Sequence, residues 1–307
     1  MLGSIEFLLA GTLAAATPLV FAAMGEVAVE KSGVLNLGIE GMMASGAAAA
    51  FVVATTSGSH PLGFLAAALI AAALSLVFAA LALGFLANQV VAGLAVGILG
   101  LGVSVLVGKD FEGATIAPLA RIDPGALGDI PLLGRVLFSQ NPTVYAGLAS
   151  VVLLWWFLGR TRAGLVLRAV GESPTSADAI GFPVTLIRVA AIAFGGAMAG
   201  IGGACLTLAY TPLWAEGLVA GRGWIVVALV VFGAWRPFRV LLGAWLFGAV
   251  SLLELFLQGQ GLGVPSQLMS ALPYLVTIVI LAAISRDPRR LRLEQPMSLG
   301  QTPSRRG

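Results

Sequence analysis

Charged residues are scarce in this chain. Of its 307 residues, 10% are charged and 59% are apolar, whereas about 25% of the residues in an ordinary soluble domain are charged. A water-soluble protein is therefore excluded. Because a membrane-spanning helix needs about 20 mostly apolar residues, the composition predicts an all-α, polytopic integral membrane protein with roughly eight to ten spans and no large soluble domain.

Cysteine and histidine are each present once, as Cys205 and His60. They cannot form a disulfide, a zinc site or a Cys/His catalytic pair. A phosphate-binding Walker loop is also missing, because the one Gly-Lys pair, Gly108-Lys109, is followed by Asp110 and lacks the first glycine of that motif. We therefore expect no catalytic residue, metal or cofactor here, and any ATP must be bound by another subunit.

Basic residues are clustered, and they account for the sequence pI of about 9.5. We interpret the clusters as a topology signal and not as a nucleic-acid-binding surface, because short cytoplasmic loops are enriched in Lys and Arg. Two predicted spans separate each cluster from the next, so all three fall on one side and the C-terminus is expected in the cytoplasm. The clusters are Arg160, Arg162 and Arg168; Arg236 and Arg239; and Arg286, Arg289, Arg290 and Arg292.

Apolar runs of suitable length predict about nine spans. The run at 222–233 is too short to cross alone, and with the glycine-rich stretch 34–46 it is typical of broken or re-entrant helices. Residues 25–33 are expected to be a loop. Residues 1–294 are expected to form the membrane domain, and 295–307 a flexible cytoplasmic tail. The predicted spans lie near residues 6–24, 34–56, 62–83, 88–107, 143–158, 184–209, 222–233, 240–257 and 271–284.

Two segments, 33–44 and 217–228, are weakly similar, since both are glycine-punctuated and lead into an apolar run. Transporters are often built from repeated halves whose interrupted helices meet at the solute path. Glycine and alanine also recur by chance in membrane proteins, so an internal repeat and a chance similarity both remain open. A stripe of small residues on one predicted helix, Gly195, Gly196, Ala199, Gly200 and Gly203, predicts close packing on a neighbouring helix.

The predicted cytoplasmic loop 159–183 contains a short helix with clear ends. Ser173 fits the N-cap, Pro174 the first helical position and Gly181 the position after the last turn. The predicted helix, Pro174–Ile180, has about two turns and is marginal in water by itself. It therefore needs a surface on which to dock, such as a motor subunit; the alternative is an ordinary interfacial loop.

Polar residues in or beside apolar runs are candidates for a solute path, because such residues are costly in a membrane and usually face a cavity or another helix. The amides of Asn88 and Gln89 suit either a ribose or base or hydrogen bonds between helices. Tryptophan suits either stacking on a base or the membrane interface. The candidates are Asn36, Glu40, Asn88, Gln89, Glu216, Arg222 and Trp224.

The stretch 168–184 followed by 195–204 resembles the coupling-loop region of the ABC-importer permeases that serve branched-chain amino acids, simple sugars and nucleosides. Three further segments, 30–43, 87–94 and 221–237, are similar to the nucleoside-type branch. The resemblance extends over most of residues 12–285, in matching order. It implies a permease subunit, without enzymatic activity of its own, in the bacterial plasma (inner) membrane.

The resemblance also implies the partners: two ABC ATPase subunits, a second permease subunit in a homo- or heteromeric pair, and an extracytoplasmic solute-binding protein. A simple-sugar or branched-chain amino acid permease is the alternative within the family. An ion-coupled secondary transporter is the alternative outside it, with Glu40 and Glu254 as its ion sites. The residues that the resemblance assigns to ATPase coupling are Gly171, Glu172, Ser173, Pro174, Ala177, Asp178 and Gly181.

Overall fold

The computed structural model describes residues 2–123, 125, 128, 130, 134–259, 268, 271–276, 278–279 and 294–301. Within these residues the chain is helical, apart from turns, extended connections and one isolated bridge between Thr115 and Leu213. Seven of the described helices are long and apolar enough to cross a membrane: α1 (Leu2–Lys31), α2 (Ile39–Ser57), α3 (His60–Ala79), α4 (Gln89–Gly108), α5 (Pro142–Arg160), α8 (Val184–Cys205) and α10 (Pro237–Gly259).

Three shorter α-helices are α6 (Arg162–Glu172), α7 (Pro174–Ala179) and α9 (Arg222–Phe232). One turn of π-helix extends α3 over Ala80–Gly84, and another extends α8 over Leu206–Tyr210. The predicted all-α membrane fold is confirmed, and the predicted count of about nine spans is approximate. The predicted short run 222–233 is α9. Within the predicted span 271–284, residues 271–276, 278 and 279 are described and are helical, and the other six lie outside the described residues.

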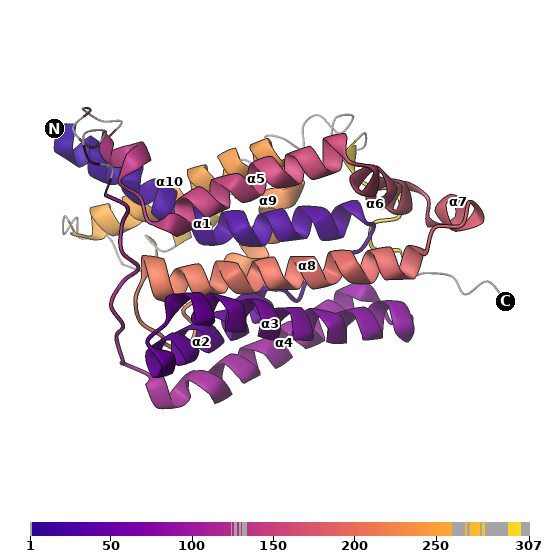
Figure 1. Cartoon of the computed structure of the whole chain (residues 1–307), viewed down its shortest axis with the longest axis horizontal. Helices are drawn as coiled ribbons and strands as arrows, with labels where there is room; N and C mark the ends of the chain where they lie inside the picture. The colour runs from indigo at the N-terminus through magenta and orange to yellow at the C-terminus, as the bar shows by residue number, and fades with distance from the viewer. Residues whose placement is uncertain are drawn as a thin grey trace.

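The helices form two groups with α8 between them. Figure 1 shows α2, α3 and α4 on one side of α8, and α1, α5 and α10 on the other. The small-residue stripe makes this packing possible, because a Cβ atom on Gly203 would lie 2.0 Å from the Met43 carbonyl oxygen, and one on Gly200 would lie 2.2 Å from that of Ala67. The predicted close packing of this stripe is confirmed.

The first helix differs from its prediction. Residues 25–33 were expected to form a loop, but α1 continues to Lys31 and buries both Glu26 and Glu30. The loop was expected because the charged residues Glu26, Glu30 and Lys31 follow the apolar run 6–24. In the folded chain, Glu30 is accommodated because its Oε2 accepts a hydrogen bond from Trp235 Nε1, between α9 and α10.

The α1–α2 connection (residues 32–38) is irregular backbone that lies inside the protein. Gly33 has a φ of +86°, which favours glycine, and its N–H donates to the Glu30 carbonyl oxygen at 2.8 Å. Asn36 Oδ1 accepts from Gly38 N at 2.9 Å, and Gln89 Oε1 accepts from Leu35 N at 2.8 Å. Non-helical backbone is tolerated at membrane depth when its polar groups are satisfied in this way.

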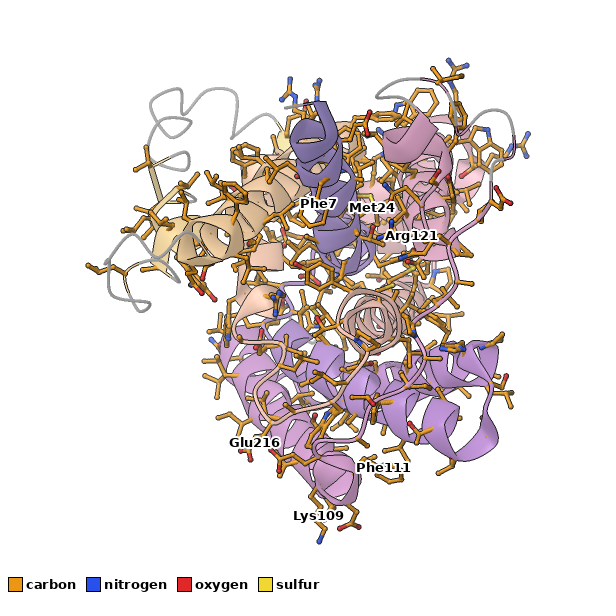
Figure 2. The ribbon with its side chains drawn as sticks, turned by 90° about the vertical axis from the view of Figure 1, so that its left-hand side faces the viewer. Phe7, Met24, Lys109, Phe111, Arg121 and Glu216 are labelled. Carbon is orange, nitrogen blue, oxygen red and sulfur yellow. The ribbon has the colours of Figure 1, made fainter. Side chains whose placement is uncertain are left out.

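The molecule has two distinct ends. Figure 2 looks onto the end that carries Lys109, Phe111 and Glu216. The helix α7 projects from the opposite end, beyond α6 and α8 (Figure 1). At that opposite end Arg236 forms an ion pair with Glu294.

Part of the predicted tail is packed against the helices. Residues 295–307 were expected to be flexible and solvated, yet Ser298 is only 4% exposed and its N–H donates to the Gly171 carbonyl oxygen at 3.1 Å. Lys31 Nζ donates to the Glu294 carbonyl oxygen at 2.8 Å. Polar residues in the segment 294–301 therefore form hydrogen bonds to other parts of the chain. Residues 302–307 lie outside the described part of the chain.

Candidate coupling and solute sites

The short helix α7 is capped as its sequence predicts. Ser173 is extended and its Oγ accepts from Ser176 N at 3.3 Å, Pro174 is the first helical residue, and Gly181 has a φ of +90°. The helix ends at Ala179, one residue earlier than predicted. Ala177 is buried, whereas Asp178 is exposed and Ile180 is 73% exposed. Most of α7 is thus uncovered by the described chain.

Gly171, in the last turn of α6, lies in backbone contact with the end of α1. A Cβ atom on Gly171 would lie 2.2 Å from the Lys31 carbonyl oxygen and 3.2 Å from Gly33 N. A glycine is required here because any side chain would separate the two segments. The end of α6, directly before α7, is therefore packed on the end of α1 and the α1–α2 connection.

Glu172 follows Gly171 and is exposed. It lines an open cavity of about 340 Å³ together with Lys31, Arg168 and Glu294. The carboxylate of Glu294 accepts from Arg236 Nε at 2.8 Å and raises the pKa of the Arg236 guanidinium above its usual value. This end of the molecule therefore combines basic and acidic side chains around the start of α7.

A second cavity, of about 330 Å³, lies between α2, α4 and the segment 214–220. This volume is at the lower end of the usual range for small-molecule pockets, about 300–1,000 Å³. Its polar side chains include Glu40, Ser104 and Glu216, and the indole of Trp214 forms part of its wall. The described residues that line it include two carboxylates and no lysine or arginine.

Glu40 ties this cavity to the start of α9. Its Oε1 accepts from Gly221 N and its Oε2 accepts from Gly223 N, each at 2.7 Å. The first N–H groups of a helix have no partner within the helix, and the positive end of the helix dipole favours a carboxylate. Glu40 lies in segment 33–44 and the two glycines lie in segment 217–228, so the structure brings the two similar segments into contact.

The helix α9 is anchored at both ends. It has 11 residues, or about 16 Å at 1.5 Å per residue, which is far less than a bilayer core of about 30 Å. Glu40 binds its first turn, and Trp235, just after its last turn, donates to Glu30. Both carboxylates come from the chain on either side of the α1–α2 connection.

The remaining solute-path candidates do not line this cavity. Asn88 caps α4, because its Oδ1 accepts from Val90 N at 3.0 Å and from Val91 N at 3.2 Å. Gln89 is buried and its Nε2 donates to the Gln301 carbonyl oxygen at 3.0 Å. Arg222 donates to the Leu218 carbonyl oxygen at 2.7 Å.

Asn36 accepts a hydrogen bond from Gly38 N within the α1–α2 connection. Trp224 is 43% exposed and is not among the residues that line the cavity. Of the seven candidates, Glu40 and Glu216 are therefore the two that line the cavity. Sequence reasoning missed Ser104, because a single serine within an apolar run gives no signal of its own. Its hydroxyl is identified only by the cavity it borders.

The spanning helices, the projecting α7 and the carboxylate-lined cavity define the class of this protein as a multi-pass membrane permease. Residues 8–281 match the family model described as the branched-chain amino acid transport system / permease component. The chain therefore belongs to this permease family.

Three curated relatives cover nearly the whole chain. The candidate glucose ABC transporter permease protein TsgC13 of Haloferax volcanii is 38% identical over 97% of each chain. The guanosine ABC transporter permease protein NupQ of Bacillus subtilis is 33% identical over 90% of this chain and 91% of its own length. The nucleoside ABC transporter permease protein NupC of Lactococcus lactis is 31% identical over 92% of this chain and 93% of its own.

No solved structure matches the chain. The family match and the three relatives identify this chain as the membrane-spanning permease subunit of an ABC importer.

Proposed function

We propose that this permease imports nucleosides or similar small polar solutes across a bacterial plasma (inner) membrane. It works with two ABC ATPase subunits, a second permease subunit and an extracytoplasmic solute-binding protein. The printed functions of NupQ and NupC, guanosine and nucleoside transport, support the nucleoside assignment. The glucose named for TsgC13 supports a simple sugar as the second candidate.

The coupling role of α7 rests on one observation: a capped six-residue helix projects from one end of the molecule with most of its surface uncovered. A helix this short gains little stability from its own hydrogen bonds, so a partner surface stabilises it. The last turn of α6, which leads into α7, packs on the α1–α2 connection and supplies a route for movement into the membrane domain. In this proposal Gly171, Glu172, Ser173, Pro174, Ala177, Asp178 and Gly181 form the contact with the ATPase.

The basic residues support a cytoplasmic location for this end and for the C-terminus. Lys31 and Arg168 border the same cavity as Glu172 and Glu294, and Arg236 is paired with Glu294. Basic residues near the ends of spanning helices favour the cytoplasmic side. The end that carries Lys109 and Glu216 (Figure 2) then faces the solute-binding protein.

The cavity of about 330 Å³ is the proposed solute path. Its carboxylates, Glu40 and Glu216, suit the hydroxyl groups of a sugar or nucleoside, because ionised carboxylates accept hydrogen bonds. The first N–H groups of α9, which would otherwise attract an anion, are already occupied by Glu40. A branched-chain amino acid carries a carboxylate as well as an ammonium group, and the described residues that line this cavity include no lysine or arginine to bind that carboxylate.

The coupling proposal is tested with purified partner subunits in liposomes. The double variant Ser173→Ala, Glu172→Arg removes the N-cap, which contributes about 0.5–2 kcal/mol, and reverses a charge beside the helix. We expect normal insertion, with loss of solute-stimulated ATP hydrolysis and uptake together. Arg239→Gln, an exposed position at the start of α10, is the control. Full coupled activity of the double variant would exclude α7 as the coupling element.

The solute proposal is tested by uptake of radiolabelled guanosine, ribose, glucose and leucine. We expect ATP-dependent uptake of a nucleoside or sugar and none of leucine. Ser104→Leu should reduce uptake without affecting ATPase association, because it fills the cavity. Ser150→Leu is the matched control, since Ser150 borders a separate apolar cavity between α1, α5, α6 and α8. Equal uptake by both variants would place the path elsewhere.

A further inference from the structure

A hydrogen-bond junction joins four parts of the chain beside the start of α7. Ser298, in the C-terminal segment (residues 294–301), donates to the Gly171 carbonyl oxygen from its N–H at 3.1 Å and from its Oγ at 2.6 Å. Arg188 of α8 donates from Nη2 to Ser298 Oγ at 3.0 Å and from Nε to the Ser32 carbonyl oxygen at 3.1 Å. The junction therefore connects α6, α8, the α1–α2 connection and the C-terminal segment.

Arg188 is an unusual residue for its position. It lies in a spanning helix and is only 2% exposed, and a buried charge in a membrane protein is costly and generally functional. Its hydrogen-bond partners in the described part of the chain are neutral oxygens, of Ser32 and Ser298. An apolar residue would pack α8 at lower cost, so simple helix packing does not account for the arginine.

The junction is also tightly fitted. A Cβ atom on Gly33 would lie 2.1 Å from Ser298 Oγ and 2.9 Å from Arg188 Nη2. A Cβ atom on Gly171 would lie 2.2 Å from the Lys31 carbonyl oxygen. Because the backbone of Gly33 and Gly171 is in such close contact with its neighbours, a shift of the residues that lead into α7 is passed to Ser32 and Gly33.

The C-terminal segment reaches further helices on either side of the junction. Gln301 accepts from Gln89 at the start of α4, and Glu294 is paired with Arg236 ahead of α10. Gln89 in turn accepts from Leu35 in the α1–α2 connection. The segment thus contacts both helix groups at the end where α7 lies.

We infer that Arg188 and Ser298 are positioning residues of energy coupling, which hold Gly171 against the α1–α2 connection so that movement of α7 is transmitted toward Glu40. The inference rests on the proposed coupling role of α7. The distance along the chain is short, because the connection ends at Gly38 and Glu40 follows in the first turn of α2. Glu40 binds α9 and borders the proposed solute path.

The test compares two truncations in the assembled transporter. Deletion of residues 294–307 removes Ser298 and Gln301, whereas deletion of residues 302–307 leaves the junction intact. The measurement is the number of solute molecules imported per ATP hydrolysed in liposomes. We expect the longer deletion to lower this ratio at least about fivefold, the lower end of typical coupling between sites, and the shorter deletion to leave it unchanged.

Point variants identify the junction itself. Arg188→Gln and Ser298→Ala should each lower the ratio, and the double variant should be no worse than the more severe single one, because the two residues act in one network. A peptide of residues 294–307, added on the ATP side, should restore coupling to the longer truncation. The same peptide with Ser298→Ala should not.

The outcomes separate the two hypotheses. An unchanged ratio in Arg188→Gln and in the longer truncation would overturn the inference, and so would failure of both to assemble, which would assign the junction to folding alone. If the Ser173→Ala, Glu172→Arg variant uncouples while the junction variants do not, the role of α7 stands and the inference fails. If that α7 variant remains coupled, the proposed function of α7 fails.

Discussion

Single carboxylates anchor α9, a short apolar helix of this permease. Glu40 binds two N–H groups at the start of α9, and Glu30 binds Trp235 after its end. In a soluble protein such residues would be satisfied by water. Here their partners are backbone and indole N–H groups from distant parts of the chain, so each carboxylate specifies where α9 lies.

Replacing Glu40 with glutamine tests this anchoring. Glu40→Gln keeps the size of the side chain, but its amide N–H₂ group would face one of the two glycine N–H groups, leaving donor against donor. We expect a loss of about 1–3 kcal/mol of stability, the usual cost of an unsatisfied buried group, and reduced uptake. Thermal unfolding in detergent measures the first effect.

The control for Glu40→Gln is Glu216→Gln, because Glu216 is exposed on the same cavity. This change should leave the unfolding temperature as it is. A Glu40→Gln protein with the wild-type unfolding temperature would contradict the anchoring role and return Glu40 to the set of simple cavity-lining residues.

At the scale of helices, glycine determines how closely α8 approaches its neighbours. The contacts of Gly200 and Gly203 are with backbone oxygens of α3 and α2, which cannot rotate away as a flexible side chain can. These positions therefore tolerate added volume poorly, even though any apolar residue would suit the surrounding hydrophobicity.

The variant Gly203→Val tests the packing of α8. Its Cβ atom would lie 2.0 Å from the Met43 carbonyl oxygen, so α2 and α8 must separate, at a cost of about 1–3 kcal/mol or more. Gly102→Ala is the control, because a Cβ atom there meets no other atom within 4 Å. Folded yield and unfolding temperature should fall for Gly203→Val alone; equal behaviour of both variants would argue against close packing.

Local signals explain which elements were predictable from the sequence. The residues that bound α7 are its neighbours in the sequence, so Ser173, Pro174 and Gly181 predicted the helix to within one residue of its end. The end of α1 was not predictable, because the burial of Glu30 depends on Trp235, which is 205 positions away. Gln89 likewise has its carbonyl partner 212 positions away, in a segment expected to be free.

The same distinction applies to the candidate sites. Composition and arginine spacing predicted the class of protein, because both reflect the membrane directly. The residues that line the cavity were identified only in part. Glu40 and Glu216 are charged residues in or beside apolar runs and were therefore candidates, whereas Ser104 is neutral and was not. Arg188 was passed over because it stands at the start of an apolar run, where an arginine is usually interfacial.

At the scale of the whole molecule, the two ends should lie on opposite sides of the membrane. Cysteine is introduced by Asp178→Cys in α7 and, in a second protein, by Glu112→Cys beside Lys109, both exposed positions. The background carries Cys205→Ser, which removes the one natural cysteine, a buried residue. A membrane-impermeant maleimide should label residue 112 from outside cells and residue 178 only after the cytoplasmic face is opened.

The side of the membrane from which each cysteine is labelled distinguishes an incorrect arrangement of the helices from an incorrect orientation of the protein. Labelling of both positions from one side would contradict the two-ended arrangement of the helices. Labelling of residue 178 from outside and of residue 112 from inside would keep the arrangement but invert the proposed orientation, and with it the cytoplasmic location of α7.

The position of Ser298 in the chain has a consequence for biosynthesis. Ribosomes make a chain from its N-terminus, so Lys31, Gly171 and Arg188 are all synthesised before Ser298. The hydrogen bonds that Ser298 makes to Gly171 and Arg188 are therefore among the last to form. A permease whose translation stops just before residue 294 lacks this junction, and in the membrane it should import fewer solute molecules per ATP hydrolysed.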